Sequence, residues 1–239
     1  MAQKLVYDGL QSCPYLDGQV ARMPLYRQLD KLGLGQADHR FAQAERRVGV
    51  CLYHTACPTC RACEGIRIPV ATFTPTKSQR RTKRRGDAAF RVEYGRATYT
   101  DAKLALFNKH KQHRGLNSGD DDTVTPLGYT SWLVHSCMHT MEMRYYLDEQ
   151  LAGVGVLDLG RTAASSVYFY FDPDPEVARL SPGVYSVLRE LDLCARTRRD
   201  HLYLGLYVRD CRHLSYKASY TPHERLVDGD WRLRAPEPA

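Results

Sequence analysis

The chain has 239 residues, of which 43% are hydrophobic and 26% charged, a composition that is ordinary for a globular protein and excludes wholesale disorder. This length allows one large domain or two smaller lobes, with a core that needs no disulfide framework. A formal net charge of +7 is too modest to identify a partner by itself. No apolar run reaches the roughly 18 residues of a membrane span, and residues 1–8 carry no signal-peptide core. We therefore expect a soluble cytoplasmic protein without a membrane partner.

The first half of the chain predicts few regular elements. Turn signals such as Cys13-Pro14 and Asp17-Gly18 recur through residues 1–35, so little regular structure is expected there. Pro69 favours an edge or a bulge in its strand, and Asp101 is the expected N-cap of its helix. Residues 116–131 are expected to form an exposed loop. The other elements predicted in this half are a helix over 37–46, strands over 48–53 and 66–73, a helix over 102–114 and a short helix over 132–139.

The second half predicts a sheet backed by helices. A hairpin is expected over 143–159, followed by a strand over 166–171 and a buried strand over 202–208. Between the last two strands, apolar residues at i, i+3, i+4 and i+7 predict an amphipathic helix. These residues are Val184, Val187, Leu188 and Leu191. The order of elements predicts an α+β core over residues 130–225, and it suits the N-acetyltransferase superfold.

Three cysteines at two-residue spacings form the sharpest local signal. Cys57, Cys60 and Cys63 can converge on one centre, and Cys13 is the natural fourth ligand, with Cys51 and His54 as further candidates. Zinc takes tetrahedral thiolates, and an iron–sulfur cluster also uses a three-cysteine run plus a remote cysteine. The alternative is a set of free thiols in a turn.

A basic run follows the cysteines and predicts either a solvated surface or a nucleic-acid contact. The six cations of the run are Lys77, Arg80, Arg81, Lys83, Arg84 and Arg85. The predicted helix over 102–114 adds a second basic surface, which favours nucleic acid bound mainly through its phosphates.

Familiar catalytic motifs are missing from the sequence, which contains no phosphate loop, nucleophile elbow or paired-histidine zinc helix. Residues 179–183 are at best a degraded form of the loop that grips CoA in acetyltransferases. Sixteen tyrosines against six phenylalanines is an unusual ratio. Most of the tyrosines are expected in the core, but Tyr168 and Tyr170 share one strand face and could line a cleft.

Eight short motifs occur in an order that identifies a family. They are Cys13-Pro14-Tyr15-Leu16, Cys57-Pro58-Thr59-Cys60-Arg61-Ala62-Cys63, Ile66-Arg67-Ile68-Pro69, Ser78-Gln79-Arg80-Arg81, Val167-Tyr168, Phe171-Asp172-Pro173, Tyr203-Leu204-Gly205 and Tyr216-Lys217-Ala218. Together they resemble the bacterial aminoacyl-tRNA–protein transferases, which are aspartate/glutamate leucyltransferases related to the arginyl-tRNA–protein transferases. The resemblance extends over about residues 12–231.

The resemblance implies an enzyme that moves an amino acid from charged tRNA onto the N-terminal Asp or Glu of a protein, marking that protein for degradation through the N-degron pathway. It implies an N-terminal region over 1–100, with the cysteines and the basic segment, and an acetyltransferase-like (GNAT-like) region over 101–239. The expected partners are aminoacyl-tRNA and the acceptor protein, and we expect a monomer. The chemistry requires no cofactor, so a metal or cluster at the cysteines would be structural or regulatory.

Site roles follow from the same motif positions. The resemblance implies catalytic roles for Tyr168, Asp172 and Lys217, with Tyr168 orienting a carbonyl and Asp172 binding or deprotonating the α-amine. It implies substrate-binding roles for Arg80, Arg81, Tyr203, Tyr207 and Tyr216. The candidate cations for the acidic acceptor side chain are Arg80, Arg81 and Lys217. Lys77, Lys83, Arg84 and Arg85 are the implied tRNA contacts, and Cys13, Cys57, Cys60 and Cys63 the implied metal ligands.

Other functions stay open on the sequence. Departures from the family pattern at residues 181–183, 206 and 212–213 leave arginine possible as the donor, although the compact length favours leucine. A CoA-dependent acetyltransferase is the second class. A non-enzymatic, metal-stabilised nucleic-acid-binding module is the third, and it would not need the long second half.

Overall fold

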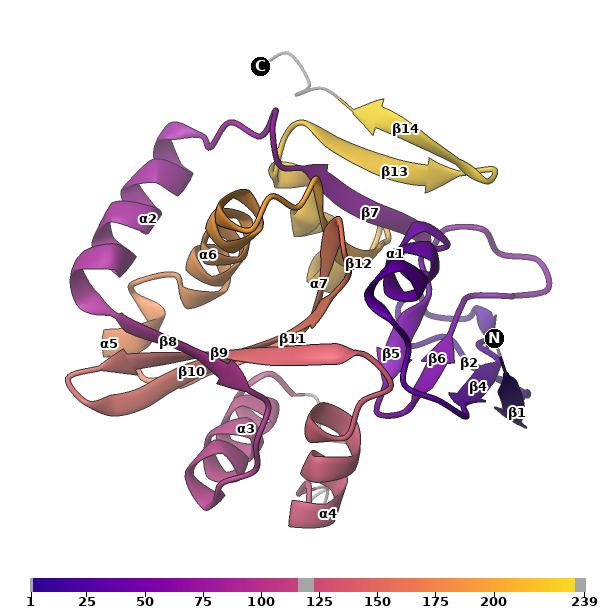
Figure 1. The fold of residues 1–239 in the computed structure, drawn as a ribbon, viewed down its shortest axis with the longest axis horizontal. Helices are drawn as coiled ribbons and strands as arrows, with labels where there is room; N and C mark the ends of the chain where they lie inside the picture. The colour runs from indigo at the N-terminus through magenta and orange to yellow at the C-terminus, as the bar shows by residue number, and fades with distance from the viewer. Residues whose placement is uncertain (1, 116–122, 235–239) are drawn as a thin grey trace.

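The computed structural model describes residues 2–115 and 123–234, and one eight-stranded sheet runs through its centre (Figure 1). The strand order is β14-β13-β7-β12-β11-β10-β9-β8. Neighbouring strands are antiparallel except β11 and β12, which are parallel. A four-stranded sheet, β1-β4-β6-β5, and the pair β2-β3 lie together on the N-terminal side of the molecule. The prediction of a mixed fold with a large sheet and covering helices is confirmed.

The first 35 residues contain four short strands, so the prediction of little regular structure there is wrong. Every residue of β1 is exposed, and no buried face imposes the apolar alternation by which strands are recognised in a sequence. Pairing between β1 and β4 sets these strands instead. The elements up to β6 are β1 (Gln3–Tyr7), β2 (Leu10–Ser12), β3 (Val20–Arg22), β4 (Leu25–Gln28), α1 (Leu34–Ala42), β5 (Arg46–Val48) and β6 (Cys51–Tyr53).

The next segment crosses into the large sheet. It contains β7 (Glu64–Pro69), α2 (Lys77–Ala89), β8 (Arg91–Arg96) and α3 (Asp101–His113). Since β7 lies between β13 and β12, and β8 forms the opposite edge, residues before position 100 contribute two strands to the same sheet as the second half. The division into regions 1–100 and 101–239 stays a prediction about sequence regions.

Two local predictions in this segment are wrong in detail. Thr100, rather than Asp101, is the N-cap of α3, because its hydroxyl accepts a hydrogen bond from the Lys103 amide. Pro69 marks neither an edge nor a bulge. It is the last residue of an interior strand and pairs with His201 of β12, whereas the pairing with β13 is confined to Ile66 and Arg67.

The second half follows the predicted order closely. Its elements are α4 (Pro126–Tyr129), the π-helical turn Thr130–Val134, β9 (His139–Leu147), β10 (Gln150–Leu159), β11 (Ala163–Phe171), α5 (Pro175–Ala178), α6 (Pro182–Arg196), β12 (His201–Tyr207), α7 (Arg212–Ser215), the 3₁₀ turn η2 (Tyr216–Ser219), β13 (His223–Val227) and β14 (Asp230–Arg234). The hairpin, the strands and helix α6 confirm the predictions. The predicted helix over 132–139 is wrong beyond residue 134, because only 132–134 are helical, as the end of the π-helical turn, and β9 begins at His139. The predicted loop 116–131 lies partly outside the described residues and otherwise includes α4.

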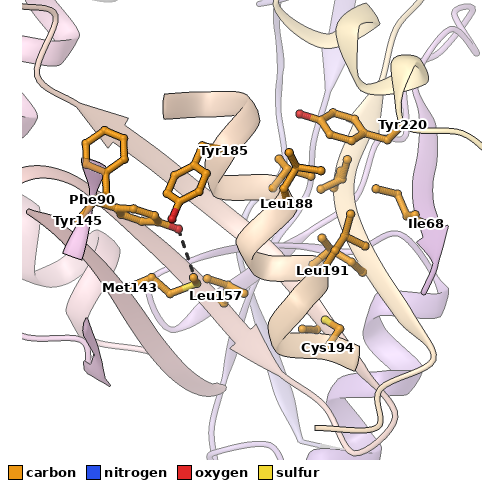
Figure 2. Close-up of a cluster of buried hydrophobic side chains, with 14 of the residues drawn as sticks. Ile68, Phe90, Met143, Tyr145, Leu157, Tyr185, Leu188, Leu191, Cys194 and Tyr220 are labelled. Atoms are coloured by element: carbon orange, nitrogen blue, oxygen red, sulfur yellow. Dashed lines mark hydrogen bonds between the residues drawn. The ribbon is translucent and has the colours of Figure 1, made fainter. Parts of the chain in front are cut away.

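The core between α6 and the sheet is built from the apolar stripe of α6. Leu188, Leu191 and Cys194 point into this core, with Ile68 and Tyr220 nearby and an aromatic group around Tyr145 further along the sheet (Figure 2). A second helix, α2, packs on α6 so closely that a methyl group at Gly86 would lie 2.3 Å from the Tyr185 ring. None of the helices in residues 2–115 and 123–234 is long and apolar enough to span a membrane.

A buried ion pair fixes the small sheet to the large one. The Arg47 Nε atom of β5 donates to Asp158 Oδ2 of β10 at 2.6 Å, and the two side chains are 1% and 2% exposed. The other carboxylate oxygen accepts a hydrogen bond from the Thr140 hydroxyl. This contact places β5, and with it the neighbouring residue Arg46, against the centre of the large sheet.

Candidate active site

The parallel strands β11 and β12 separate along their length. They pair only through Ala163–Ser165 and His201–Tyr203, although β11 continues to Phe171 and β12 to Tyr207. On β12 the register with β7 also shifts between Tyr203 and Gly205, and Gly205 has a left-handed φ of +80°. We refer to the space between residues 166–168 of β11 and 205–206 of β12 as the strand gap.

Arg46 from the N-terminal part of the chain fills one side of the strand gap. Its guanidinium donates to the carbonyl oxygens of Ser166 (3.0 Å) and Val167 (3.3 Å) and to the Ser165 hydroxyl (3.3 Å). A methyl group at position 205 would lie 2.6 Å from the Arg46 Cζ atom. Glycine is therefore required there both for its backbone conformation and for the approach of the guanidinium.

Lys217 enters the same place from η2. Its ammonium Nζ donates to the Leu206 carbonyl oxygen at 2.7 Å, one residue beyond Gly205. Burial, helped by the nearby Arg46 cation, lowers the pKa of Lys217 to about 7, while Cys211 acts in the opposite direction. A lysine with such a pKa is partly a neutral amine at physiological pH and can accept a proton.

Two predicted tyrosines, Tyr168 and Tyr216, lie within reach of the Arg114 charge, and the Tyr168 ring packs against Phe107 of α3 and Trp132. Burial raises the pKa of the Tyr168 and Tyr216 hydroxyls, and the Arg114 guanidinium partly offsets both shifts. Arg114, just after α3, also lies 3.1 Å from the His213 Nδ1 atom of α7. The end of α3 therefore connects β11 with the segment that carries Lys217.

Glu190 of α6 lies beneath the strand gap and is completely buried. Its Oε1 atom accepts hydrogen bonds from the hydroxyls of Ser166 and Ser186, both at 3.3 Å, while Oε2 has no hydrogen-bond partner among the described residues. Burial raises its pKa to about 8. The carboxyl also acts electrostatically on Tyr216.

The structure places the other predicted site residues elsewhere. Tyr203 is buried, its ring contacts Phe41 and Trp231, and its hydroxyl accepts a hydrogen bond from Arg67 at 2.8 Å. Tyr207 is also a buried core residue, with the Arg225 guanidinium over its ring. Both tyrosines serve packing, as tyrosines on a buried strand usually do.

Asp172 follows β11 and already binds an ammonium group. Its Oδ1 atom lies 2.6 Å from Lys109 Nζ of α3 and accepts a hydrogen bond from the Asp174 amide at 2.9 Å. The carboxylate is 24% exposed, so another cation can reach it.

The predicted basic run is helix α2, which presents most of its cations to solvent. Thr76 caps it together with Gln79, and the Gln79 amide also donates to the Ser219 carbonyl oxygen of η2 at 3.2 Å. Helix α2 therefore begins beside the segment that carries Lys217. Lys83 differs from its neighbours because it pairs with Asp87 at 2.8 Å and Asp192 at 2.9 Å. The exposed cations are Lys77, Arg80, Arg81, Arg84 and Arg85.

The four predicted cysteines line one cavity of about 570 Å³ next to β13. Burial raises the pKa of Cys63 to about 12, and Cys57, Cys13 and Cys60 each add to the shift. The thiols are therefore neighbours, and their chemistry suits a soft metal ion or cluster. Among the described residues, however, no three His, Cys, Asp or Glu side chains converge closely enough to hold a metal as they stand.

Sequence reasoning missed Arg46 and Glu190. Glu190 could have been noticed, because it interrupts the apolar stripe of α6 between Val187 and Leu191. Gly205 inside an apolar strand is a general signal of a close approach, but it does not say which residue approaches. Nothing in the sequence around Arg46 marks it.

Comparison with known proteins identifies the class of protein to which this site belongs. Residues 11–81 match the family model of the arginine-tRNA-protein transferase N terminus, and residues 102–227 match that of its C terminus. The chain belongs to the aminoacyl-tRNA–protein transferase family, as its motif order predicted.

Particular relatives are named aspartate/glutamate leucyltransferase. One from Chromohalobacter salexigens is 32% identical over 94% of this chain and 90% of its own, and one from Stenotrophomonas maltophilia is 33% identical over 95% and 92%. Among solved structures, the C-terminal domain of a putative lysylphosphatidylglycerol synthetase from Agrobacterium fabrum has a TM-score of 0.47 at 11% identity, covering 62% of this chain and 47% of that one. A score this low does not establish a shared fold.

Proposed function

We propose that this protein transfers leucine from leucyl-tRNA to the N-terminal Asp or Glu of proteins in the cytoplasm, marking them for N-degron degradation. The observation that carries the assignment of the site is Lys217, a buried amine with a lowered pKa in the strand gap, with Tyr168 on the adjoining part of β11 and Tyr216 next to Lys217 in the chain. The names of the relatives support the substrates. We propose that the enzyme acts as a monomer.

The chemistry needs a free α-amine and a polarised ester. The α-ammonium group of a protein has a pKa of about 7.7–8.0, so a base near pH 7 can take its proton. In the proposed step, the amine nitrogen bonds to the ester carbonyl carbon and the bond from that carbon to the tRNA ribose oxygen breaks. Lys217 Nζ receives the proton of the amine and returns it to the ribose oxygen. Tyr168 orients the carbonyl and donates to the developing oxyanion.

Substrate binding is assigned to cations and to one carboxylate. Arg80 and Arg81 of α2 are proposed to bind the acidic acceptor side chain, since α2 begins beside η2. Asp172 is proposed to bind the α-ammonium group by exchanging it for Lys109. Tyr216 offers an aromatic face that is half exposed, at 50%.

The proposed fold of the second region is acetyltransferase-like, because two parallel strands separate next to a central helix. In this chain, the Arg46 guanidinium already donates hydrogen bonds to the carbonyl oxygens of Ser166 and Val167 on one side of the strand gap. An amide-bearing CoA arm would have to displace that guanidinium. We therefore expect acetyl-CoA to leave the melting temperature unchanged, whereas an acetyltransferase would be stabilised by its cofactor.

The test is a transfer assay with purified full-length protein, tRNA charged with labelled leucine or labelled arginine, and peptides that begin with Asp, Glu or Ala. We expect leucine on the Asp and Glu peptides and none on the Ala peptide. Label from arginyl-tRNA alone would change the donor, and no label from either tRNA would overturn the proposed reaction.

Helix α2 is expected to bind tRNA through phosphates. Replacing Lys77, Arg84 and Arg85 with alanine should weaken tRNA binding and flatten its salt dependence, since each lost phosphate contact removes about 0.7–0.9 from the log–log slope. Lys83→Ala is the matched control, because Lys83 is already neutralised by two aspartates and should change the slope less. Filter binding from low to moderate salt measures the slope. An unchanged slope in the triple variant would make the exposed face of α2 a solvated surface.

The four cysteines are proposed to share one metal ion or iron–sulfur centre, which would stabilise the N-terminal part of the chain. We expect elemental analysis and absorption spectra of anaerobically purified protein to show that centre, and Cys60→Ser to abolish it with a lower melting temperature. Cys194→Ser, on the buried face of α6, should retain the centre. Metal-free protein whose stability survives Cys60→Ser would reduce the cluster to free thiols.

A further inference from the structure

Two cationic side chains from distant parts of the sequence meet at one glycine in the strand gap. Arg46 comes from β5, and its guanidinium lies over Gly205; Lys217 comes from η2, and its Nζ atom binds the carbonyl oxygen of the next residue, Leu206. The described hydrogen-bond partners of Arg46 are two carbonyl oxygens and one hydroxyl, none of which neutralises its charge. The partner of Lys217 is also a neutral carbonyl.

We propose that Arg46 is a positioning residue for the transfer, whose fixed charge beside Gly205 keeps the Lys217 amine in the neutral form that accepts a proton. This inference rests on the proposed function and assigns the electrostatic control of its base. A like charge nearby disfavours protonation of an amine. The three hydrogen bonds of the Arg46 guanidinium hold its charge in place beside Lys217. Arginine suits this role because it stays protonated at every relevant pH.

The other charged and titratable groups around Lys217 do not replace this effect. Cys211, at the N-cap of α7, acts in the opposite direction and favours the ammonium form. Glu190 of α6 and Arg114 at the end of α3 act on the neighbouring Tyr216. Arg46 is therefore the cation whose removal should raise the pKa of Lys217.

The geometry also explains why this residue comes from the N-terminal region. Arg46 is adjacent to Arg47, which is held by the buried pair with Asp158. The guanidinium therefore reaches the gap only when β5 is docked on the large sheet. The docking of β5 on the large sheet and the protonation state of Lys217 are therefore coupled.

The experiment compares Arg46→Met, Arg46→Gln and Arg46→Lys with the wild type. The pH dependence of Lys217 acetylation by acetic anhydride, read by mass spectrometry of its peptide, reports the protonation of Lys217 without any transfer reaction. The pH profile of kcat/KM for leucine transfer is measured in parallel. Arg199→Met is the matched control, because Arg199 also binds backbone carbonyl oxygens, those of Gly160 and Ala163.

Both neutral variants should move the labelling midpoint and the acid limb of kcat/KM upward by about one pH unit, which is a tenfold loss of rate on the acid side that recovers at high pH. Arg46→Lys, which keeps the charge, should move them less, and Arg199→Met should move neither. A labelling midpoint that stays in place in Arg46→Gln overturns the inference, even if activity falls. A midpoint that moves while the kcat/KM profile does not would instead overturn Lys217 as the base in the proposed function.

Discussion

Replacing Lys217 with methionine is expected to lower kcat for leucine transfer by at least about 100-fold, the usual contribution of a general base. Methionine keeps much of the length of the buried side chain but cannot accept a proton. In the wild type, the rate should rise with pH through about 7, because the amine is active only when neutral and burial lowers its pKa to that value. Single-turnover transfer from leucyl-tRNA to an Asp-starting peptide, measured from pH 6 to 9, tests both statements.

Two further variants make this test specific. Lys217→Arg should remain inactive, because a guanidinium stays protonated and cannot serve as a base. Lys31→Met, at an exposed position far from Lys217 in the sequence, should behave as the wild type. Because Lys217 is placed at the reacting groups, tRNA affinity should change little in Lys217→Met. A variant that retains more than a tenth of wild-type kcat would remove Lys217 from the mechanism.

Asp158→Asn is expected to destabilise the protein by about 3–5 kcal/mol, the typical cost of breaking a buried ion pair from one side. The change leaves the Arg47 guanidinium buried without a counter-charge, since both side chains are almost fully enclosed. Because this pair holds β5 against β10, activity should also fall in the variant while it is still folded. Urea denaturation followed by circular dichroism measures the loss.

The control is an arginine–carboxylate ion pair that is exposed to solvent on the surface of the protein. Glu176→Gln removes the partner of Arg179, where both side chains are mostly exposed, and should cost about 0–1 kcal/mol. If Asp158→Asn costs no more than Glu176→Gln, the buried pair does not secure the small sheet.

Local patterns in the sequence predicted the elements that carry a strong periodic signal. The apolar stripe of α6, the hairpin of β9 and β10 and the apolar run of β12 all bury one or both faces, so their side chains reveal the structure. The motif order revealed the family for a different reason, since it depends on residue identity rather than on packing. Strands β1 and β2 escaped prediction because all their residues are exposed and no buried face shapes their sequence, and β3 and β4 are only three and four residues long.

The candidate site was only partly predictable. Lys217 and Tyr168 stand in motifs and lie near the strand gap, whereas Tyr203 and Tyr207, which stand in or beside a motif of equal strength, are core residues. A motif records that a residue type is needed at a position, but the direction of its side chain depends on the strand register. On β12 that register shifts at Gly205.

The sequence by itself determined the family, the order of elements in the second half and the basic character of the segment that became α2. Tertiary structure alone decided that Arg46, Gly205 and Lys217 meet. Arg46 is far in the chain from the other two, and it reaches them because the buried pair of Arg47 and Asp158 holds β5 against the large sheet, beside the point where β11 and β12 separate. The protonation of Lys217 depends on burial and on a neighbouring charge, and both are properties of the folded chain rather than of any segment of it.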